Sequence, residues 1–256
     1  MTSIPNQKLR VRSKLNPWLD VLAIVAWGVL IFKYWLTGKL NLLIHPHYFW
    51  LAILGAVGLL AVGLFKGRQL LQRRQAVENS AQHISIFPPG WGSKLLLGAA
   101  ILGLIITPQV FASQTALQRG VTDLVGVTRP QPQAFHASIR PEERSLVDWV
   151  RLLNVYPEPD AYTGQKVKIK GFVIHPPDLG KEYLLLARFV ITCCAADAYP
   201  AGLPVKLPAT NESYPGDSWL EVEGQMITET LSGKRQLTVA ATSLKKIPQP
   251  KDPYSY

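Results

Sequence analysis

Three long apolar runs within the first 112 residues constrain the fold more than any other feature. They are Trp18–Leu36, Tyr48–Phe65 and Leu95–Ala112. Each has about the 17–25 residues that a helix needs to cross the hydrocarbon core of a bilayer. Asp20 and Lys33 lie near the ends of the first run, where charged side chains can reach water. No small-residue cleavage site follows the first run, so we expect three retained membrane spans.

The basic residues of this half predict its orientation. Residues 1–112 carry 11 Lys and Arg but only two acidic residues, and the basic side chains concentrate in residues 1–17 and 66–94. The hairpin 37–47 between the first two runs carries only Lys39 as a fixed charge. The positive-inside rule therefore places the N-terminus and the 66–94 loop in the cytoplasm and the hairpin outside. Three spans would then leave the rest of the chain outside, which predicts a multi-pass protein of a plasma (inner) membrane.

The second half has a different composition and different functional limits. Residues 113–256 carry 16 Lys and Arg against 15 Asp and Glu. A nearly neutral domain lacks the basic footprint of a nucleic-acid-binding protein. Polar residues with Gly, Pro, Gln and Thr over 113–139 predict a linker. We expect a basic tail (1–17), three transmembrane helices (18–112), this linker, and an extracytoplasmic helix with a β domain (140–256).

The last 117 residues have the pattern of one helix followed by short strands. Leu146, Trp149, Val150 and Leu153 lie on one face of a helix predicted over 141–153. Five strands follow, near 167–173, 183–193, 205–207, 219–224 and 237–241. The fold class predicted for the whole chain is a membrane α-helical half with a mainly-β, OB-like small barrel. A small open sandwich is the alternative for the β domain.

The two cysteines of the chain, Cys193 and Cys194, are adjacent at the end of the second predicted strand. They could be small buried residues, since free cysteine is often buried. A disulfide between neighbours would require a strained ring. If the following residues turn into a helix, its N-terminus would favour thiolates. Cys193, Cys194 and Asp197 are then a candidate site for zinc or another thiophilic metal.

Histidines offer further ligands, although nothing in the sequence places them beside the cysteines. His136 and His175 are candidates to complete that site. His45 and His47, which flank Pro46, could bind a metal or could simply anchor the second span at the interface.

No arrangement of residues indicates an enzyme. There is no catalytic triad, phosphate-binding loop or nucleotide-binding motif. Glu221 and Glu223 alternate on one strand face like a carboxylate pair, and Lys166, Lys168 and Lys170 alternate on another. Solvent-exposed faces of antiparallel strands explain both patterns. A thiol oxidoreductase is the least favoured reading, because a Cys-x-x-Cys spacing is missing.

Five segments together resemble a known family. They are Ile44-His-Pro46, Gly164–Val173, Arg188–Ala198 with its Cys-Cys-Ala-Ala-Asp run, Trp219–Gly224 and Pro253–Tyr256. They resemble a bacterial family of permease subunits from two-component transport systems. Its members are small membrane proteins with an extracytoplasmic β domain carrying a Cys-Cys-x-Ala-Asp motif. The resemblance implies a partner, a larger multi-span permease similar to organoarsenical efflux permeases.

Two functions are therefore expected from the sequence. The first is an accessory subunit of a two-component membrane permease, whose outer domain gates the exit or delivers a ligand. The alternative is a membrane-anchored, thiol-dependent module that binds a soft metal as a sensor or chaperone.

Overall fold

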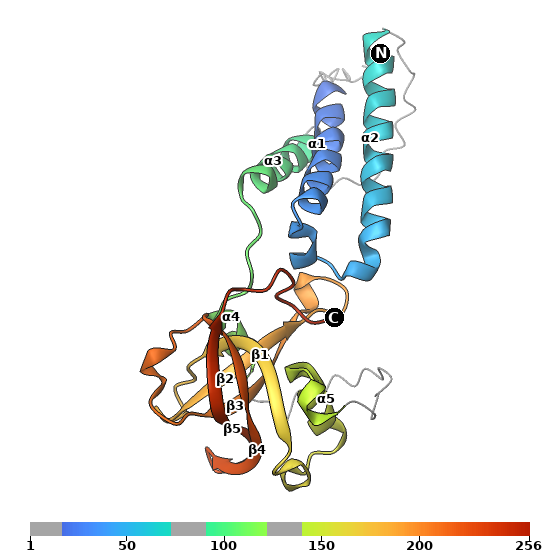
Figure 1. Cartoon of the computed structure of the whole chain (residues 1–256). Helices are drawn as coiled ribbons and strands as arrows, with labels where there is room; N and C mark the ends of the chain where they lie inside the picture. The colour runs from blue at the N-terminus through green and yellow to red at the C-terminus, as the bar shows by residue number, and fades with distance from the viewer. Residues whose placement is uncertain (1–16, 73–90, 122–139) are drawn as a thin grey trace, which may run out of the picture. The chain divides into compact units, whose positions relative to one another are not determined.

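The computed structural model describes residues 17–72, 91–121 and 140–256. Within these ranges the chain forms two compact units (Figure 1). The helical unit holds the described residues before Leu42 and those from Pro46 to Pro108, and the β unit holds Leu42–His45 and Gln109–Tyr256. Most of the predicted basic tail, cytoplasmic loop and linker lies outside the described residues, as does His136.

The described part of the helical unit has three apolar helices: α1 (Pro17–Leu36), α2 (Phe49–Leu71) and α3 (Trp91–Ile105). Two of them are long and apolar enough to cross a membrane, and α3, with 15 residues, is shorter. The third run was expected to stay helical to Ala112, but α3 ends at Ile105. Pro108 accounts for this end, because it lacks an N–H and disfavours helical backbone at the residue before it.

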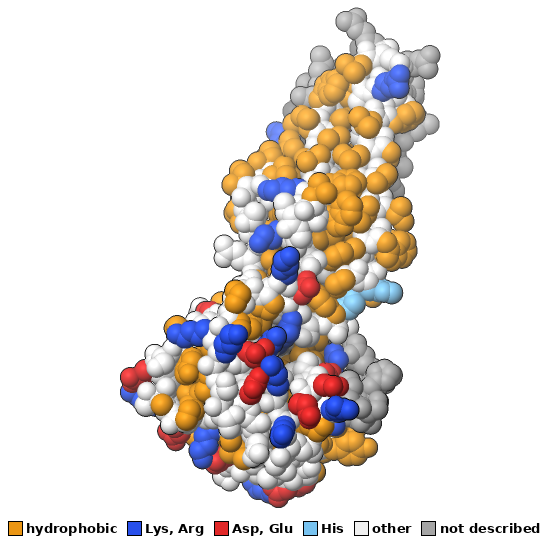
Figure 2. Space-filling model, viewed as in Figure 1, with side chains coloured by type: hydrophobic (Ala, Val, Ile, Leu, Met, Phe, Trp, Pro, Cys, Tyr) orange, Lys and Arg blue, Asp and Glu red, His pale blue; other side chains and the backbone are white. Residues whose placement is uncertain are grey.

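Apolar side chains cover much of the face of the helical unit that Figure 2 shows. On α2, Trp50 and Leu54 are each 59% exposed and Leu64 is 72% exposed. Soluble proteins rarely expose apolar surface along a whole helix, whereas lipid contact requires it.

Glycines bring the three helices close together. A Cβ atom on Gly63 of α2 would lie 2.5 Å from Val25 Cγ2 of α1, and one on Gly103 of α3 would lie 2.9 Å from Leu30 Cδ2. Ala56 is completely buried. Small residues at these positions therefore serve packing within the unit, as small residues do where helices meet in lipid.

Polar side chains of α1 bond to both ends of α3. Asp20 accepts a hydrogen bond from Ser93 in the first turn of α3. At the other end, Lys33 Nζ donates to the Leu104 carbonyl at 2.5 Å and Tyr34 Oη donates to the Gly103 carbonyl at 2.6 Å. The last carbonyls of a helix have no partner within it, so these donors satisfy groups that are costly to leave unpaired in an apolar setting. The contacts also show that α3 runs parallel to α1.

In the residues that the structure describes, the β unit contains two helices, five strands and several short 3₁₀ turns. The helices are α4 (Ser113–Gln118), which lies within the predicted linker, and α5 (Leu146–Val155). The strands are β1 (Lys166–Ile174), β2 (Tyr183–Val190), β3 (Tyr199–Lys206), β4 (Trp219–Leu231) and β5 (Lys234–Ile247). The 3₁₀ turns of this unit are η3 (Pro141–Glu143), η4 (Pro159–Tyr162), η5 (Ala195–Asp197) and η6 (Asn211–Ser213), whereas η1 (Lys39–Leu42) and η2 (Pro46–Tyr48) lie in the connection between α1 and α2.

The strands pair in the order β1-β2-β3-β5-β4, and β4 pairs again with β1. All pairs are antiparallel except β3 with β5. Each of the five strands thus has two neighbours. The β4–β5 turn has positive φ at both Ser232 and Gly233, the backbone of a two-residue type I′ hairpin. The predicted mainly-β domain with five strands is confirmed.

The sheet separates two hydrophobic cores. Leu184 and Leu186 of β2 face the first core, which also holds Leu146, Trp149 and Val150 of α5. The predicted apolar face of this helix is therefore confirmed, and its first turn is capped by Ser145 and Asp148. Alternate residues of β2 enter the second core, which contains the following residues: Leu42, Ala116, Val121, Phe172, Ile174, Leu185, Ala187, Phe189, Ile191, Ala198, Trp219 and Tyr254. Burial on both faces explains why the sequence of β2 is continuously apolar.

The glycine contacts predict that Gly63→Ala destabilises the helical unit. Its methyl group would meet Val25, a β-branched side chain with little rotational freedom, so α1 and α2 must separate at a cost of about 1–3 kcal/mol. Gly58→Ala on the same helix is the matched control, since a Cβ there has no neighbour within 4 Å. Thermal unfolding of both variants in detergent measures the difference. Equal midpoints for the two variants would contradict this packing.

Candidate functional site

The two cysteines lie in the loop that connects β2 to β3, which we call the cysteine loop (residues 191–198). β2 ends at Val190, whereas the second strand was predicted to continue to Cys193. Neither cysteine is therefore part of the strand. The side chain of Cys193 is exposed and that of Cys194 is half-buried, and both are free thiols. The expected helical segment after them is confirmed only as η5, a single 3₁₀ turn.

Asp197 gives the cysteine loop its shape. Its carboxylate accepts hydrogen bonds from three successive backbone amides: Thr192 (3.2 Å), Cys193 (2.7 Å) and Cys194 (3.4 Å). Partial burial acts to raise the pKa of Asp197, but hydrogen bonds from the Cys193 thiol and from these amides outweigh it and lower that pKa. Asp197 therefore carries a negative charge that the loop backbone stabilises.

The same carboxylate changes the chemistry of Cys193. The hydrogen bond from the thiol to Asp197, followed by that with Cys194, raises the pKa of Cys193 to about 11. The expectation that a helix N-terminus would favour thiolates here was wrong for Cys193. A single 3₁₀ turn provides little dipole, and the negative carboxylate opposes a second negative charge beside it.

Backbone pairing with a segment from the α1–α2 connection also holds the cysteine loop. Ile44 and Cys194 form an antiparallel bridge, with hydrogen bonds from His45 N–H to the Cys193 carbonyl (3.0 Å) and from Ala195 N–H to the Leu43 carbonyl (2.8 Å). The segment Leu43–His45 comes from the connection between α1 and α2. Extended backbone before Pro46 was the one signal in the sequence that could have indicated a strand-like segment there.

Two further segments support the loop. Arg119, which follows α4, donates to the carbonyls of Ala195 and Ala198. The C-terminal segment pairs with the end of β2, where Ile191 N–H donates to the Ser255 carbonyl at 2.9 Å. Neither contact could be predicted from local sequence, because each joins parts of the chain that are far apart.

The candidate metal ligands Cys193, Cys194 and Asp197 lie close together in the cysteine loop. In the described ranges, no group of three or more His, Cys, Asp and Glu side chains is placed to hold a metal ion. Asp197 already uses its oxygens on backbone amides, and His175 Nε2 lies 2.7 Å from the Tyr214 carbonyl. Metal binding by Cys193, Cys194 and Asp197 stays a prediction.

The hairpin histidines belong to different units. The ring of His45 lies 5.1 Å from that of Tyr256 between centroids, and the ring of His47 lies 5.7 Å from that of Tyr48. Each histidine thus packs on a tyrosine.

The carboxylates and lysines that alternate on neighbouring strands pair with each other. Lys168 Nζ lies 2.7 Å from Glu223 and Lys170 Nζ lies 2.9 Å from Glu221. Lys170 is the main cause that lowers the pKa of Glu221. Cross-strand ion pairing between β1 and β4 accounts for the alternation of Lys168, Lys170, Glu221 and Glu223, as expected for solvated strand faces.

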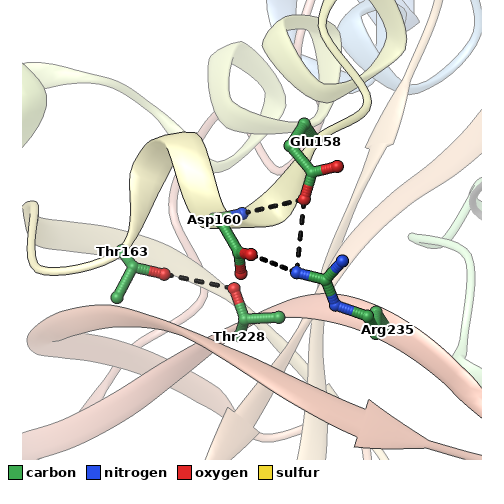
Figure 3. Close-up of polar contacts among 5 residues, drawn as sticks. All are labelled: Glu158, Asp160, Thr163, Thr228 and Arg235. Carbon is green, nitrogen blue, oxygen red and sulfur yellow. Dashed lines mark hydrogen bonds and ion pairs between the residues drawn. The ribbon is translucent and has the colours of Figure 1, made fainter.

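A second polar cluster lies where η4 meets the β4–β5 hairpin (Figure 3). Arg235 bonds to Asp160 and lies 3.3 Å from Glu158, and Thr163 bonds to Thr228 at 3.1 Å. Hydrogen bonds from Thr228 and Arg235 lower the pKa of Asp160. These exposed side chains satisfy one another, so the cluster fixes the hairpin and lacks the unpaired groups of a reactive site.

The hydrogen bond to Asp197 predicts slow alkylation of Cys193. With its pKa near 11, only about one thiol in a thousand is ionised at pH 8, so iodoacetamide should react on the order of 100-fold more slowly than with an ordinary cysteine. The reaction rate should keep rising with pH up to about 11. Asp197→Asn, which removes the opposing charge, should raise the rate at pH 8 about tenfold or more.

The rate is measured by mass spectrometry of the Cys193 peptide in the full chain, in a Cys194→Ser background. Asp178→Asn, a carboxylate in the β1–β2 turn, is the control and should leave the rate unchanged. A half-maximal rate near pH 8.5 in the protein with Asp197 intact would show that the carboxylate does not control the thiol.

Comparisons with known proteins agree with the division of the chain. Residues 133–256 match the family model of the DUF1980 C-terminal domain. The chain is also 27% identical over 129 residues to the UPF0703 protein YcgQ of Bacillus subtilis (strain 168), a match that covers 48% of this chain and 45% of YcgQ. The match thus spans less than half the length of that relative. The chain therefore contains a DUF1980 C-terminal domain and is a distant homologue of YcgQ.

Proposed function

We propose that this protein is an accessory subunit of a membrane permease. Its helical unit docks on a larger multi-span partner in a bacterial plasma membrane, and its β unit gates the exit or delivers a ligand. The observation that carries the proposal is that both charged side chains of α1 are hydrogen-bonded within the helical unit. These side chains are Asp20 and Lys33, and each bonds to α3. A transport path needs polar groups of its own, so we assign the path to the partner.

The orientation proposed with this function has the N-terminus in the cytoplasm and the β unit outside. The pairing of Leu43–His45 with the cysteine loop supports it, because the connection between α1 and α2 then lies on the same side of the membrane as the β unit. If α1 and α2 each cross, α2 returns the chain to the cytoplasm. α3 must cross as well for the chain to reach the β unit.

α3 is short for such a crossing. Fifteen residues span roughly 22 Å, against a hydrocarbon core of about 30 Å. A short helix is accommodated by local thinning of the bilayer and by polar side chains that reach the interface. Lys33 and Tyr34, which bond to the last carbonyls of α3, supply such groups at one end.

We also propose an OB-like barrel for the β unit. The closed strand order β1-β2-β3-β5-β4 supports it. The connection between β3 and β4 contains only the short turn η6. An experimental structure with an unpaired edge strand in this sheet would contradict the assignment.

The orientation predicts opposite behaviour of two reporter fusions. Alkaline phosphatase joined after Tyr256 should be active, because it folds only outside the cytoplasm, whereas the same enzyme joined after Gln72 at the end of α2 should be inactive. Green fluorescent protein at the same two positions should give the reverse pattern. An inactive phosphatase after Tyr256, with fluorescence at that position, would rule out the outer location.

The permease role predicts a stoichiometric partner. The tagged full chain, purified from its native membranes in mild detergent after brief cross-linking, should bring with it a single multi-span membrane protein in near-equal amount. The untagged chain, carried through the same purification, is the control, and mass spectrometry identifies and quantifies the partner. Purification of the chain without such a protein would count against the accessory role.

A further inference from the structure

The backbone of the cysteine loop holds the connection between α1 and α2. Three contacts join them: the Ile44–Cys194 bridge and the two hydrogen bonds of His45 with Cys193 and of Ala195 with Leu43. The segment Leu42–His45 belongs to the β unit. The residues directly before and after it in the chain belong to the helical unit. A change in the loop backbone would therefore act on the chain between two apolar helices.

Asp197 fixes the loop in the conformation that makes these contacts. Its carboxylate binds the amides of residues 192–194, and the amide of Cys193 is the closest at 2.7 Å. The carbonyl of the same residue accepts from His45. Interaction of the Cys193 thiol with this carboxylate raises the pKa of the thiol. One residue thus joins an exposed sulfur, the carboxylate that shapes the loop, and the pairing with His45.

We propose that Cys193 and Asp197 form a thiol-controlled latch, in which a thiophilic group bound to the Cys193 sulfur releases Leu43–His45 from the cysteine loop. When the sulfur takes such a group, the S–H bond breaks, the new bond to sulfur forms, and the proton leaves to solvent. The sulfur can no longer donate to Asp197, and the added group lies beside the carboxylate. Asp197 then shifts from the amides that it orders, and the backbone pairing with Leu43–His45 weakens. The latch does not depend on the permease role.

The test uses phenylmercuric acetate, which binds a single thiol, on the full chain in detergent. The S–H bond is replaced by an S–Hg bond, and acetate leaves as acetic acid. Hydrogen–deuterium exchange with mass spectrometry then follows a peptide that contains the His45 amide. Loss of its hydrogen bond to the Cys193 carbonyl should speed exchange at the His45 amide by up to about tenfold.

Variants separate the latch from general disruption. Cys194→Ser should respond to the mercurial as the unmodified sequence does. Cys193→Ser keeps a donor for Asp197 but lacks the sulfur. Its His45 amide should therefore stay protected from exchange, and the mercurial should not change that. Cys193→Ala loses the donor without adding bulk, so exchange at His45 should be faster even without the reagent.

Two results would overturn the latch. One is unchanged exchange at His45 when intact mass shows that Cys193 is fully mercurated. The other is an equal rise in exchange in the β4–β5 hairpin, which would show that the reagent unfolds the whole unit.

Discussion

The conformation of the cysteine loop, where four segments of the chain meet, depends on one anion, the carboxylate of Asp197. Its oxygens accept hydrogen bonds from the backbone amides of residues 192–194. The loop that it shapes receives Leu43–His45, Arg119 and the C-terminal segment around Ser255. Without a carboxylate at this position, the part-buried amides of Thr192 and Cys194 would lose this partner, and unpaired backbone donors are costly where water is excluded.

Local patterns in the sequence predicted most of the architecture. Uniform hydrophobicity indicated the helices of the N-terminal half, and the 3.6-residue period of Leu146, Trp149 and Val150 indicated α5. Alternation and turn residues located five strands, with β3 extending further than predicted because Pro200 and Gly202 broke its apolar pattern. The end of α3 was missed because the apolar run continues past Ile105, and hydrophobicity alone does not show where a helix stops.

The environment of the cysteines could not be predicted in the same way. The adjacency of Cys193 and Cys194 marked the loop as unusual, and Asp197 was correctly associated with it as a neighbour of the cysteines in space. Its hydrogen bonds with the loop backbone were not predicted, because the sequence does not distinguish a carboxylate that accepts from backbone amides from one that binds a metal. The contacts with Leu43–His45 and Ser255 join segments that are far apart in the chain. Local sequence propensity therefore cannot predict them.

Asp197 cannot fully serve two roles at once. A carboxylate oxygen that coordinates a cation gives up hydrogen-bonding capacity toward the amides of residues 192–194, so a ligand that recruits it must compete with the folded loop. Such a site binds more weakly than a preformed one by the free energy of the contacts it displaces. By linkage, any change in the α1–α2 connection that loosens Leu43–His45 would make the Cys193 sulfur and the Asp197 carboxylate easier to recruit. The same competition that lowers affinity at this loop therefore couples it to the connection between the two helices.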